Sequence, residues 1–181
     1  FYNLNPMTMT FKLLLFSATI LFTACSAPSQ TTPTMTTHTS NPYYSRTDTT
    51  PITIANSEWK KVLPEEVYYI AREQGTERAF TGKYWDFEGL GTYYCAACGN
   101  QLFRSDSKFG SGCGWPSFFE PVRKTAVRYI DDNTHGMVRT EVRCGRCDGH
   151  LGHVFDDGPP PTGLRFCMNS IVLDFEPDAG K

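Results

Sequence analysis

The stretch LRFCMNS, residues 164–170, reads as a β-strand with two contrasting faces. In an extended chain, alternate side chains point to the same side. One side carries the apolar residues Leu164, Phe166 and Met168. The other side carries Arg165, Cys167 and Asn169. A cysteine that only packs behaves as a small hydrophobe and belongs with the apolar residues. The position of Cys167 on the polar side therefore predicts that its thiol faces a functional site.

Short runs of the same kind surround this strand. They are separated by Gly, Pro, Asp and Asn, and they are TYYC (92–95), QLF (101–103), PSFF (116–119), AVRYI (126–130), MVRTEVR (137–143) and SIVLDF (170–175). Such runs predict antiparallel sheets. Ahead of them, residues 57–75 indicate two short helices, with Ser57 as the cap of the first and Pro64 in the first turn of the second.

The first 24 residues have the layout of an export signal. We expect residues 1–6 to precede the true start, with a methionine shortly afterwards as the initiator. One positive charge, Lys12, is followed by the apolar run 13–22 and by a small residue before Cys25. The apolar run is about half of the roughly 20 residues that span a bilayer. The sequence therefore predicts a secretory signal and not a permanent transmembrane helix.

The residues LFTA before Cys25 resemble the lipobox of bacterial lipoproteins, in which the cysteine carries the lipid. Phe22 departs from the usual Leu or Val, and ordinary cleavage nearby would leave Cys25 free or remove it. Of residues 26–51, 17 of 26 are Ser, Thr or Pro, so we expect residues 25–55 to be a disordered tether behind the lipid. A domain anchored in this way faces the periplasm, and Ser26, in place of the aspartate of some inner-membrane lipoproteins, favours the outer membrane.

We expect the folded domain over residues 56–181. Hydrophobic residues make up 40% of the whole chain, which is enough for a core. The formal net charge is −2, unlike the strongly basic surface typical of nucleic-acid binding. We therefore expect no nucleic-acid partner, and we expect a monomer.

Two C-x-x-C pairs stand out in this domain. CAACG contains Cys95 and Cys98, and CGRCD contains Cys144 and Cys147. Together they offer four thiolates to one tetrahedral Zn²⁺, and a closed four-cysteine shell is typical of a structural site. Two vicinal disulfide-type pairs are the alternative in an oxidising compartment. The expected fold class is therefore mainly β, two antiparallel sheets with short N-terminal helices and a four-cysteine zinc site.

His150 and His153 follow the second pair and could compete as zinc ligands. A site of two cysteines and two histidines would leave one C-x-x-C pair without a role, so the four-cysteine site is preferred. With the zinc shell closed, catalysis must lie elsewhere. Cys113, in the glycine-flanked loop GSGCGWPSFF, and Cys167 remain. Arg165 favours the thiolate of Cys167.

Several blocks of sequence then point to one family. They are GSGCGWPSF (110–118), THGM (134–137), RCGRCDGHLGHVFDDGP (143–159) and PTGLRFCMNS (161–170). In this order they resemble the signature blocks of the B-type methionine sulfoxide reductases, over about residues 57–175. The resemblance implies a mostly β domain with a structural zinc. It also implies reduction of the R epimer of methionine sulfoxide, peptide-bound or free.

The resemblance also implies roles for single residues. Cys167 matches the catalytic cysteine, Cys113 the recycling cysteine, and Trp115 the aromatic wall of the pocket. The polar residues that match those lining the pocket are His150, His153 and Asn169.

The chemistry of a sulfoxide fits these residues. Its sulfur becomes electrophilic once the oxygen is protonated, so the site needs a thiolate and an acid, and histidine suits the second role. We favour His153 as the acid and His150 as its support; either histidine could instead be a buried structural residue. The sulfenic acid left on Cys167 condenses with Cys113, and a thioredoxin-like partner reduces the disulfide. Alternatively, Cys113 merely packs, or Cys167 is resolved directly by an external thiol.

Two other functions stay open at this point. One is an exported zinc-ribbon module that binds protein or nucleic acid. The other is a thiol–disulfide oxidoreductase that uses Cys113 and Cys167, although such enzymes usually carry their pair as one C-x-x-C. Activity on an R-sulfoxide with dithiothreitol as reductant separates all three.

Overall fold

The computed structural model describes residues 40–180. The expected export signal, the lipid site at Cys25 and most of the expected tether lie outside the described residues. Among the described helices, none combines the length and the apolar character needed to cross a membrane.

Two short helices precede the sheets, as the sequence predicts. They are α1 (Asn56–Val62) and α2 (Glu65–Glu73). The start of α1 differs from the expectation, because Ala55 occupies the N-cap without a side-chain hydrogen bond and Ser57 lies inside the helix. Pro64 occupies the N-cap of α2, one position before the predicted first turn. The buried residues of the two helices, which attach them to the domain, are Trp59, Val67, Ile70 and Ala71.

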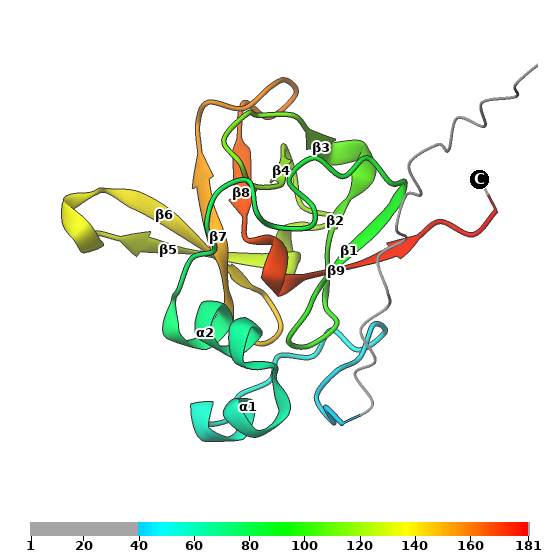
Figure 1. Ribbon diagram of the computed structural model, residues 1–181, viewed down its shortest axis with the longest axis vertical. Helices are drawn as coiled ribbons and strands as arrows, with labels where there is room; N and C mark the ends of the chain where they lie inside the picture. The colour runs from blue at the N-terminus through cyan, green and yellow to red at the C-terminus, as the bar shows by residue number, and fades with distance from the viewer. Residues whose placement is uncertain (1–39, 181) are drawn as a thin grey trace, which may run out of the picture. The chain divides into compact units, whose positions relative to one another are not determined.

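The remainder of the domain is two antiparallel sheets, which confirms the predicted fold class (Figure 1). The three-stranded sheet has the order β2 (Gln101–Arg104), β1 (Gly91–Cys95), β9 (Leu173–Pro177). The six-stranded sheet has the order β3 (Lys108–Phe109), β4 (Ser117–Phe118), β8 (Arg165–Met168), β7 (His150–Phe155), β6 (Arg139–Cys144), β5 (Val127–Asp132). Four 3-10 turns connect these strands, η1 (Ser105–Ser107), η2 (Lys124–Ala126), η3 (Thr134–Gly136) and η4 (Ser170–Val172).

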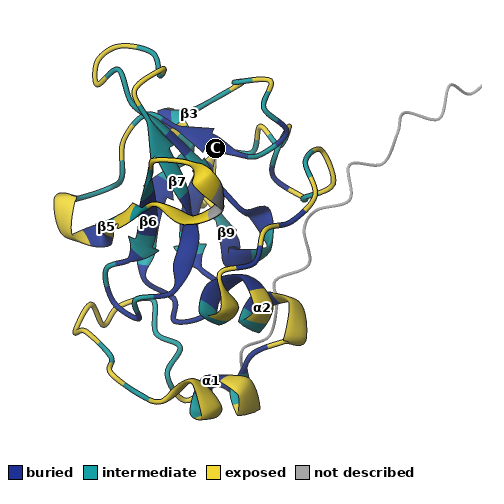
Figure 2. Ribbon diagram, turned by 90° about the vertical axis from the view of Figure 1, so that its left-hand side faces the viewer, coloured by how far each residue is buried: buried dark blue, intermediate teal, exposed yellow. Residues whose placement is uncertain are grey.

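Aromatic side chains from both sheets form the core. Phe103 of β2 stacks on Phe118 of β4 with ring centroids 4.4 Å apart. Phe166 of β8 lies 5.7 Å from Phe103, and Tyr93 of β1 lies 5.0 Å from Phe118. All four are at most 1% exposed, and Figure 2 shows this buried interior in dark blue. Burial of large aromatic rings therefore fixes the two sheets against each other.

The pairing of the six strands aligns one row of residues across the sheet. From β3 to β5 the row is Phe109, Ser117, Cys167, His153, Glu141 and Ile130. Directly paired residues of antiparallel strands point to the same face. The sheet itself therefore sets Cys167 between Ser117 and His153, on the face opposite the buried Phe118 and Phe166.

Residues 164–170 alternate largely as predicted. Phe166 and Met168 are buried, whereas Cys167 is half-buried on the other face. The strand is shorter than the stretch, because β8 covers only Arg165–Met168. Asn169 therefore lies just beyond the strand, and it is buried.

Residues 41–52, which we call the N-terminal strap, depart from the expected disordered tether. Asn41 Nδ2 donates to the carbonyl of Ala97 at 2.9 Å, and the backbone N–H of Ser45 donates to the carbonyl of Cys98 at 2.9 Å. Further along, the N–H of Ile52 donates to the carbonyl of Arg146 at 2.7 Å. A Ser/Thr/Pro-rich composition predicts disorder because such a segment buries little apolar surface. Here hydrogen bonds to the folded domain order the strap.

Candidate functional site

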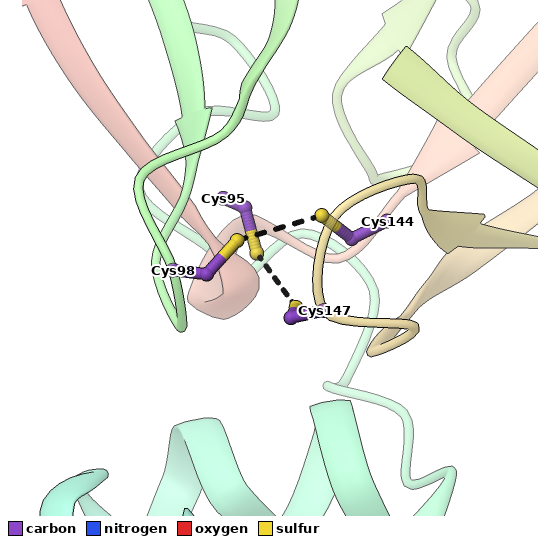
Figure 3. Close-up of side chains that lie close together, drawn as sticks. All are labelled: Cys95, Cys98, Cys144 and Cys147. Atoms are coloured by element: carbon purple, nitrogen blue, oxygen red, sulfur yellow. Dashed lines mark hydrogen bonds between the residues drawn. The ribbon is translucent and has the colours of Figure 1, made fainter. Parts of the chain in front are cut away.

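The four cysteines of the two C-x-x-C pairs meet in the interior of the domain (Figure 3). All four are buried, and their sulfurs lie within 4.8 Å of one another. Two close approaches join the two pairs: Cys95 to Cys147 at 3.8 Å and Cys98 to Cys144 at 3.6 Å. Each pair lies where a strand, β1 or β6, runs into a tight turn.

This arrangement fits a tetrahedral metal ion. Sulfurs about 2.3 Å from a zinc ion at the centre of a tetrahedron lie about 3.8 Å from one another, close to the observed spacings. All four cysteines are free thiols, which argues against a disulfide within either C-x-x-C pair. His150 and His153 lie outside the group and bind carboxylates instead. The four buried cysteines are therefore consistent with a structural metal site.

The remaining two cysteines of the described chain lie together. The Sγ atoms of Cys113 and Cys167 are 3.5 Å apart, and both are free thiols. Ser111 Oγ donates to the Cys113 sulfur at 3.0 Å, and Ser117 Oγ lies 3.6 Å from it. Because Ser117 pairs with Cys167 across β4 and β8, the same residue anchors the glycine-rich loop next to the strand. The structure thus brings together the two thiols that the sequence proposes as a redox pair.

The two thiols differ in acidity. Burial opposes ionisation of Cys113, but hydrogen bonds from Ser111 and Ser117 outweigh it and lower its pKa to about 7. Burial and, to a smaller extent, the neighbouring Cys113 raise the pKa of Cys167 while Arg165 lowers it, and the pKa is about 12. The expected influence of Arg165 therefore has the predicted sign but is smaller than the effect of burial. In the absence of substrate, Cys113 is the thiol that ionises first.

Arg165 is held by a residue that the sequence reading did not single out. Its Nε and Nη2 atoms bind the two carboxylate oxygens of Asp157, each at 2.8 Å. The guanidinium also lies 4.4 Å from the ring centre of Phe155, its partner in the adjacent strand. A bidentate pair of this kind fixes the plane of the guanidinium. In the sequence, the only indication of a role for Asp157 is its place in the signature block 143–159.

The two histidines share a face because of an irregularity in the sheet. His153 pairs with Glu141 and His150 pairs with Arg143, although residues three apart in a regular strand face opposite ways. The register of β6 and β7 shifts between Val142 and Arg143. An extra residue in one strand of this kind re-aims the side chains beyond it. The rings of His150 and His153 consequently lie 5.5 Å apart.

Each histidine binds a carboxylate at the edge of a cavity of about 350 Å³. His150 Nδ1 lies 2.7 Å from Glu141, and His153 Nε2 lies 2.7 Å from Asp132. Burial lowers the pKa of His150, and the nearby Glu141 raises it to a smaller extent. The sequence does not single out either acid, because Asp132 lies 21 residues from His153 and Glu141 lies 9 residues from His150 along the chain. Only the pairing of β5, β6 and β7 brings them to the histidines.

Asn169 and Trp115 meet at the backbone of Glu77. Asn169 Oδ1 accepts from the Glu77 N–H at 3.0 Å, and its Nδ2 donates to the carbonyl of Leu151 at 3.0 Å. Trp115 Nε1 donates to the carbonyl of Glu77 at 3.3 Å. The Glu77 carboxylate accepts the backbone N–H groups of Ser170 and Ile171 at 2.7 and 3.0 Å. Glu77 therefore ties Trp115 and the segment after β8 to each other.

Comparison with known proteins agrees with this geometry. The SelR domain family matches residues 63–177. A protein of Agrobacterium fabrum is 59% identical over 123 residues, which are 68% of this chain and 91% of that protein. A protein of Thiobacillus denitrificans is 62% identical over 122 residues, which are 67% of this chain and 92% of that protein. Both are named peptide methionine sulfoxide reductase MsrB. The match spans more than half of the chain, and the chain belongs to the SelR domain family.

Proposed function

We propose that this chain reduces the R epimer of methionine sulfoxide, in oxidised proteins or as the free amino acid, to methionine. The observation that carries the proposal is the pair of thiols, Cys113 and Cys167, 3.5 Å apart beside His153 in a SelR domain. The names of the relatives, peptide methionine sulfoxide reductase, supply the substrate class.

The reaction proceeds by transfer of the sulfoxide oxygen to a cysteine. The Cys167 thiolate attacks the substrate sulfur while His153 supplies a proton to the oxygen, and His150 supports His153. The oxygen then moves to the Cys167 sulfur: the substrate S–O bond and the transient bond between the two sulfurs break, a Cys167 S–O bond forms, methionine leaves, and Cys167 becomes a sulfenic acid. The Cys113 thiol then attacks the Cys167 sulfur, which releases water and forms a disulfide. A thioredoxin-like dithiol reduces that disulfide and restores both thiols.

Two features of the site assist ionisation of Cys167. Arg165 lowers its pKa, and Asp157 holds that guanidinium in place. Trp115 forms the apolar wall for the S-methyl group, and Asn169 holds the segment after β8.

We also infer that the four-cysteine group holds one Zn²⁺. Its support is the donor set of four buried thiols at tetrahedral spacing. A zinc ion held there by four protein ligands stabilises the fold and leaves no position for substrate. The catalytic steps therefore belong to the residues around Cys167.

We further propose that the domain is exported and lipid-anchored through Cys25, facing the periplasm, at the outer membrane. Its support is the sequence of residues 7–26 alone. Such an enzyme would act on oxidised envelope proteins. Incorporation of labelled fatty acid, lost in Cys25→Ala, tests this part independently of activity.

Activity is tested with purified protein, dithiothreitol and the separate R and S epimers of methionine sulfoxide. Chiral chromatography should show consumption of the R epimer only, and Cys167→Ser should remove that activity. Reduction of the S epimer, or of neither, would contradict the proposal. Reduction of insulin disulfides without sulfoxide reduction would favour the thiol–disulfide oxidoreductase instead.

A further inference from the structure

Two carboxylates bind the pocket histidines through different ring nitrogens. Glu141 of β6 lies 2.7 Å from Nδ1 of His150. Asp132 of β5 lies 2.7 Å from Nε2 of His153. Neither carboxylate has a step in the proposed reaction. The proposed reaction does not explain why one histidine is bound through Nδ1 and the other through Nε2.

Glu141 is fixed on several sides. It is 4% exposed, and Arg143 Nη2 binds it at 2.8 Å. Gln74 Nε2, at the end of α2, donates to it at 3.3 Å. Burial opposes ionisation of Glu141, but the hydrogen bonds from Arg143 and His150 outweigh it and lower the pKa of its carboxyl. An ionised carboxylate only accepts hydrogen bonds, so Nδ1 of His150 is the nitrogen that carries the proton.

Asp132 is fixed in the same manner from its own hairpin. The backbone N–H and the hydroxyl of Thr134 donate to it at 2.9 and 2.6 Å, and Arg139 Nη2 binds it at 2.6 Å. The hydrogen bonds from Thr134, then that from His153, hold the pKa of Asp132 well below its usual range. Asp132 is therefore also an acceptor, and Nε2 of His153 carries the proton.

We propose that Glu141 and Asp132 are positioning residues that hold the two pocket histidines in opposite tautomers. His150 has its proton on Nδ1 and a free lone pair on Nε2, whereas His153 has its proton on Nε2 and a free lone pair on Nδ1. This inference rests on the proposed function and deepens it, because it names the ring atom of each histidine that can exchange a proton with the substrate.

The tautomer of His153 determines which of its ring nitrogens delivers the proton. When His153 takes up a second proton, that proton goes to Nδ1 while Nε2 remains bound to Asp132. The positive charge then lies against an ionised carboxylate, and the new N–H is the one available to the sulfoxide oxygen. His150, held by Glu141, keeps its lone pair on Nε2 and acts as an acceptor. His153 can therefore donate a proton through Nδ1, whereas His150 can accept one through Nε2.

Long-range ¹H–¹⁵N correlation of the ¹⁵N-labelled full chain reads the tautomers directly and needs no turnover. Loss of single signals in His150→Asn and His153→Asn assigns the spectrum. We expect the wild type to show a protonated Nδ1 on His150 and a protonated Nε2 on His153. The same tautomer on both rings, or the reverse assignment, would overturn the proposal. If the chain failed to reduce sulfoxides, the spectrum would still decide this inference separately.

Matched variants test whether the carboxylates impose the tautomers. Glu141→Gln and Asp132→Asn offer both donors and acceptors, so each should mix the tautomers of its own histidine and leave the other unchanged. Glu73→Gln and Asp131→Asn, which line the same cavity but do not bind the rings, should leave both unchanged. If Glu141→Gln fails to fold, Asp132→Asn and its matched control Asp131→Asn decide the question. Asp132→Asn should lower kcat about tenfold or more with little change in KM; an unchanged spectrum and kcat would remove Asp132 from this role.

Discussion

The thiol of Cys113 lies 3.5 Å from the thiol of Cys167 although 54 residues separate the two in the chain. Ser117 explains the approach, because it pairs with Cys167 in the sheet and its hydroxyl lies near the Cys113 sulfur. The glycine-rich loop is thus tied to the strand that carries the second thiol. The two cysteines can therefore act in sequence without a large movement of either.

The first prediction concerns Cys167. Cys167→Ser should abolish sulfoxide reduction with every reductant, because no other thiol can form the sulfenic acid at that position. The measurement is methionine formed per enzyme, with dithiothreitol and with a thioredoxin. Residual activity with either reductant would mean that another group attacks the sulfur.

The second prediction concerns Cys113. Cys113→Ser should still form one methionine per enzyme, because Arg165 remains beside Cys167 and the like charge of Cys113 is gone. Cycling with a thioredoxin should then collapse, and a small thiol that attacks the sulfenic acid should partly restore it. Rapid-quench measurement of the methionine formed per enzyme in the first turnover tests this prediction. Wild-type cycling of Cys113→Ser on thioredoxin would remove Cys113 from the recycling role.

The third prediction concerns pH. A thiol reacts with iodoacetamide as its thiolate, whose fraction increases as the pH rises through the pKa. Without substrate, alkylation of Cys113 should rise around pH 7, whereas alkylation of Cys167 should stay slow until far more alkaline pH. Ser111→Ala removes a donated hydrogen bond, so the pKa of Cys113 should increase and its alkylation at pH 7 should slow. Peptide mass spectrometry locates the label, and faster labelling of Cys167 at pH 7 would contradict the assignment.

Much of this site follows from sequence, and the reason is local. The alternation in residues 164–170 places Cys167 opposite Phe166 and Met168, and the C-x-x-C spacing sets two sulfurs per turn. Both signals depend on neighbours within a few residues. The fold class follows for the same reason, since short strands and short helices are local patterns.

What the sequence could not supply depends on pairing between distant segments. Glu141 and Asp132 reach the histidines only through the register of β5, β6 and β7. The register shift that brings His150 to the same face as His153 likewise depends on the pairing of β6 with β7. Composition alone does not predict that the strap is ordered, because its hydrogen bonds go to partners roughly 50 to 100 residues away in the chain.

The fourth prediction concerns the metal. Changing any one of the four thiol ligands to serine should lower zinc content and stability together, because binding free energy is folding free energy in such a site. The variants are Cys95→Ser, Cys98→Ser, Cys144→Ser and Cys147→Ser. Metal analysis and thermal unfolding of the same samples measure both effects. A variant that keeps wild-type stability without zinc would contradict the structural role.

The last prediction concerns Arg146, which fastens the strap to both cysteine turns. Its Nη1 donates to the carbonyls of Cys98 and Tyr43 at 2.5 and 2.8 Å, and its Nη2 binds Asp48 at 2.9 Å. The contact is close, since a Cβ at Gly99 would lie 2.6 Å from the backbone oxygen of Ser45. The strap therefore covers the turn that carries Cys95 and Cys98, and it is held by Arg146 of the turn that carries Cys144 and Cys147.

Arg146→Ala removes the hydrogen bonds to the carbonyls of Cys98 and Tyr43 and the ion pair with Asp48, and we expect it to lower the free energy of unfolding by about 1–3 kcal/mol. The strap should also become sensitive to proteolysis, and zinc should transfer faster to a chromogenic chelator, because both turns lose their common tie. Arg146→Lys should recover little, since a single ammonium cannot reproduce the planar fork of the guanidinium. The matched control is Arg128→Ala, which removes an exposed ion pair to Asp148 and should cost less than about 1 kcal/mol.

Gly99→Ala tests the same contact from the other side. Gly99 has a φ of +79°, and its added Cβ would push against Ser45. We expect the same release of the strap and the same faster loss of zinc, with the side chain of Arg146 intact. If both variants release the strap to proteolysis while zinc leaves at the wild-type rate, the strap does not secure the metal site. If neither releases it, the hydrogen bonds to Ala97 and Cys98 hold the strap without Arg146.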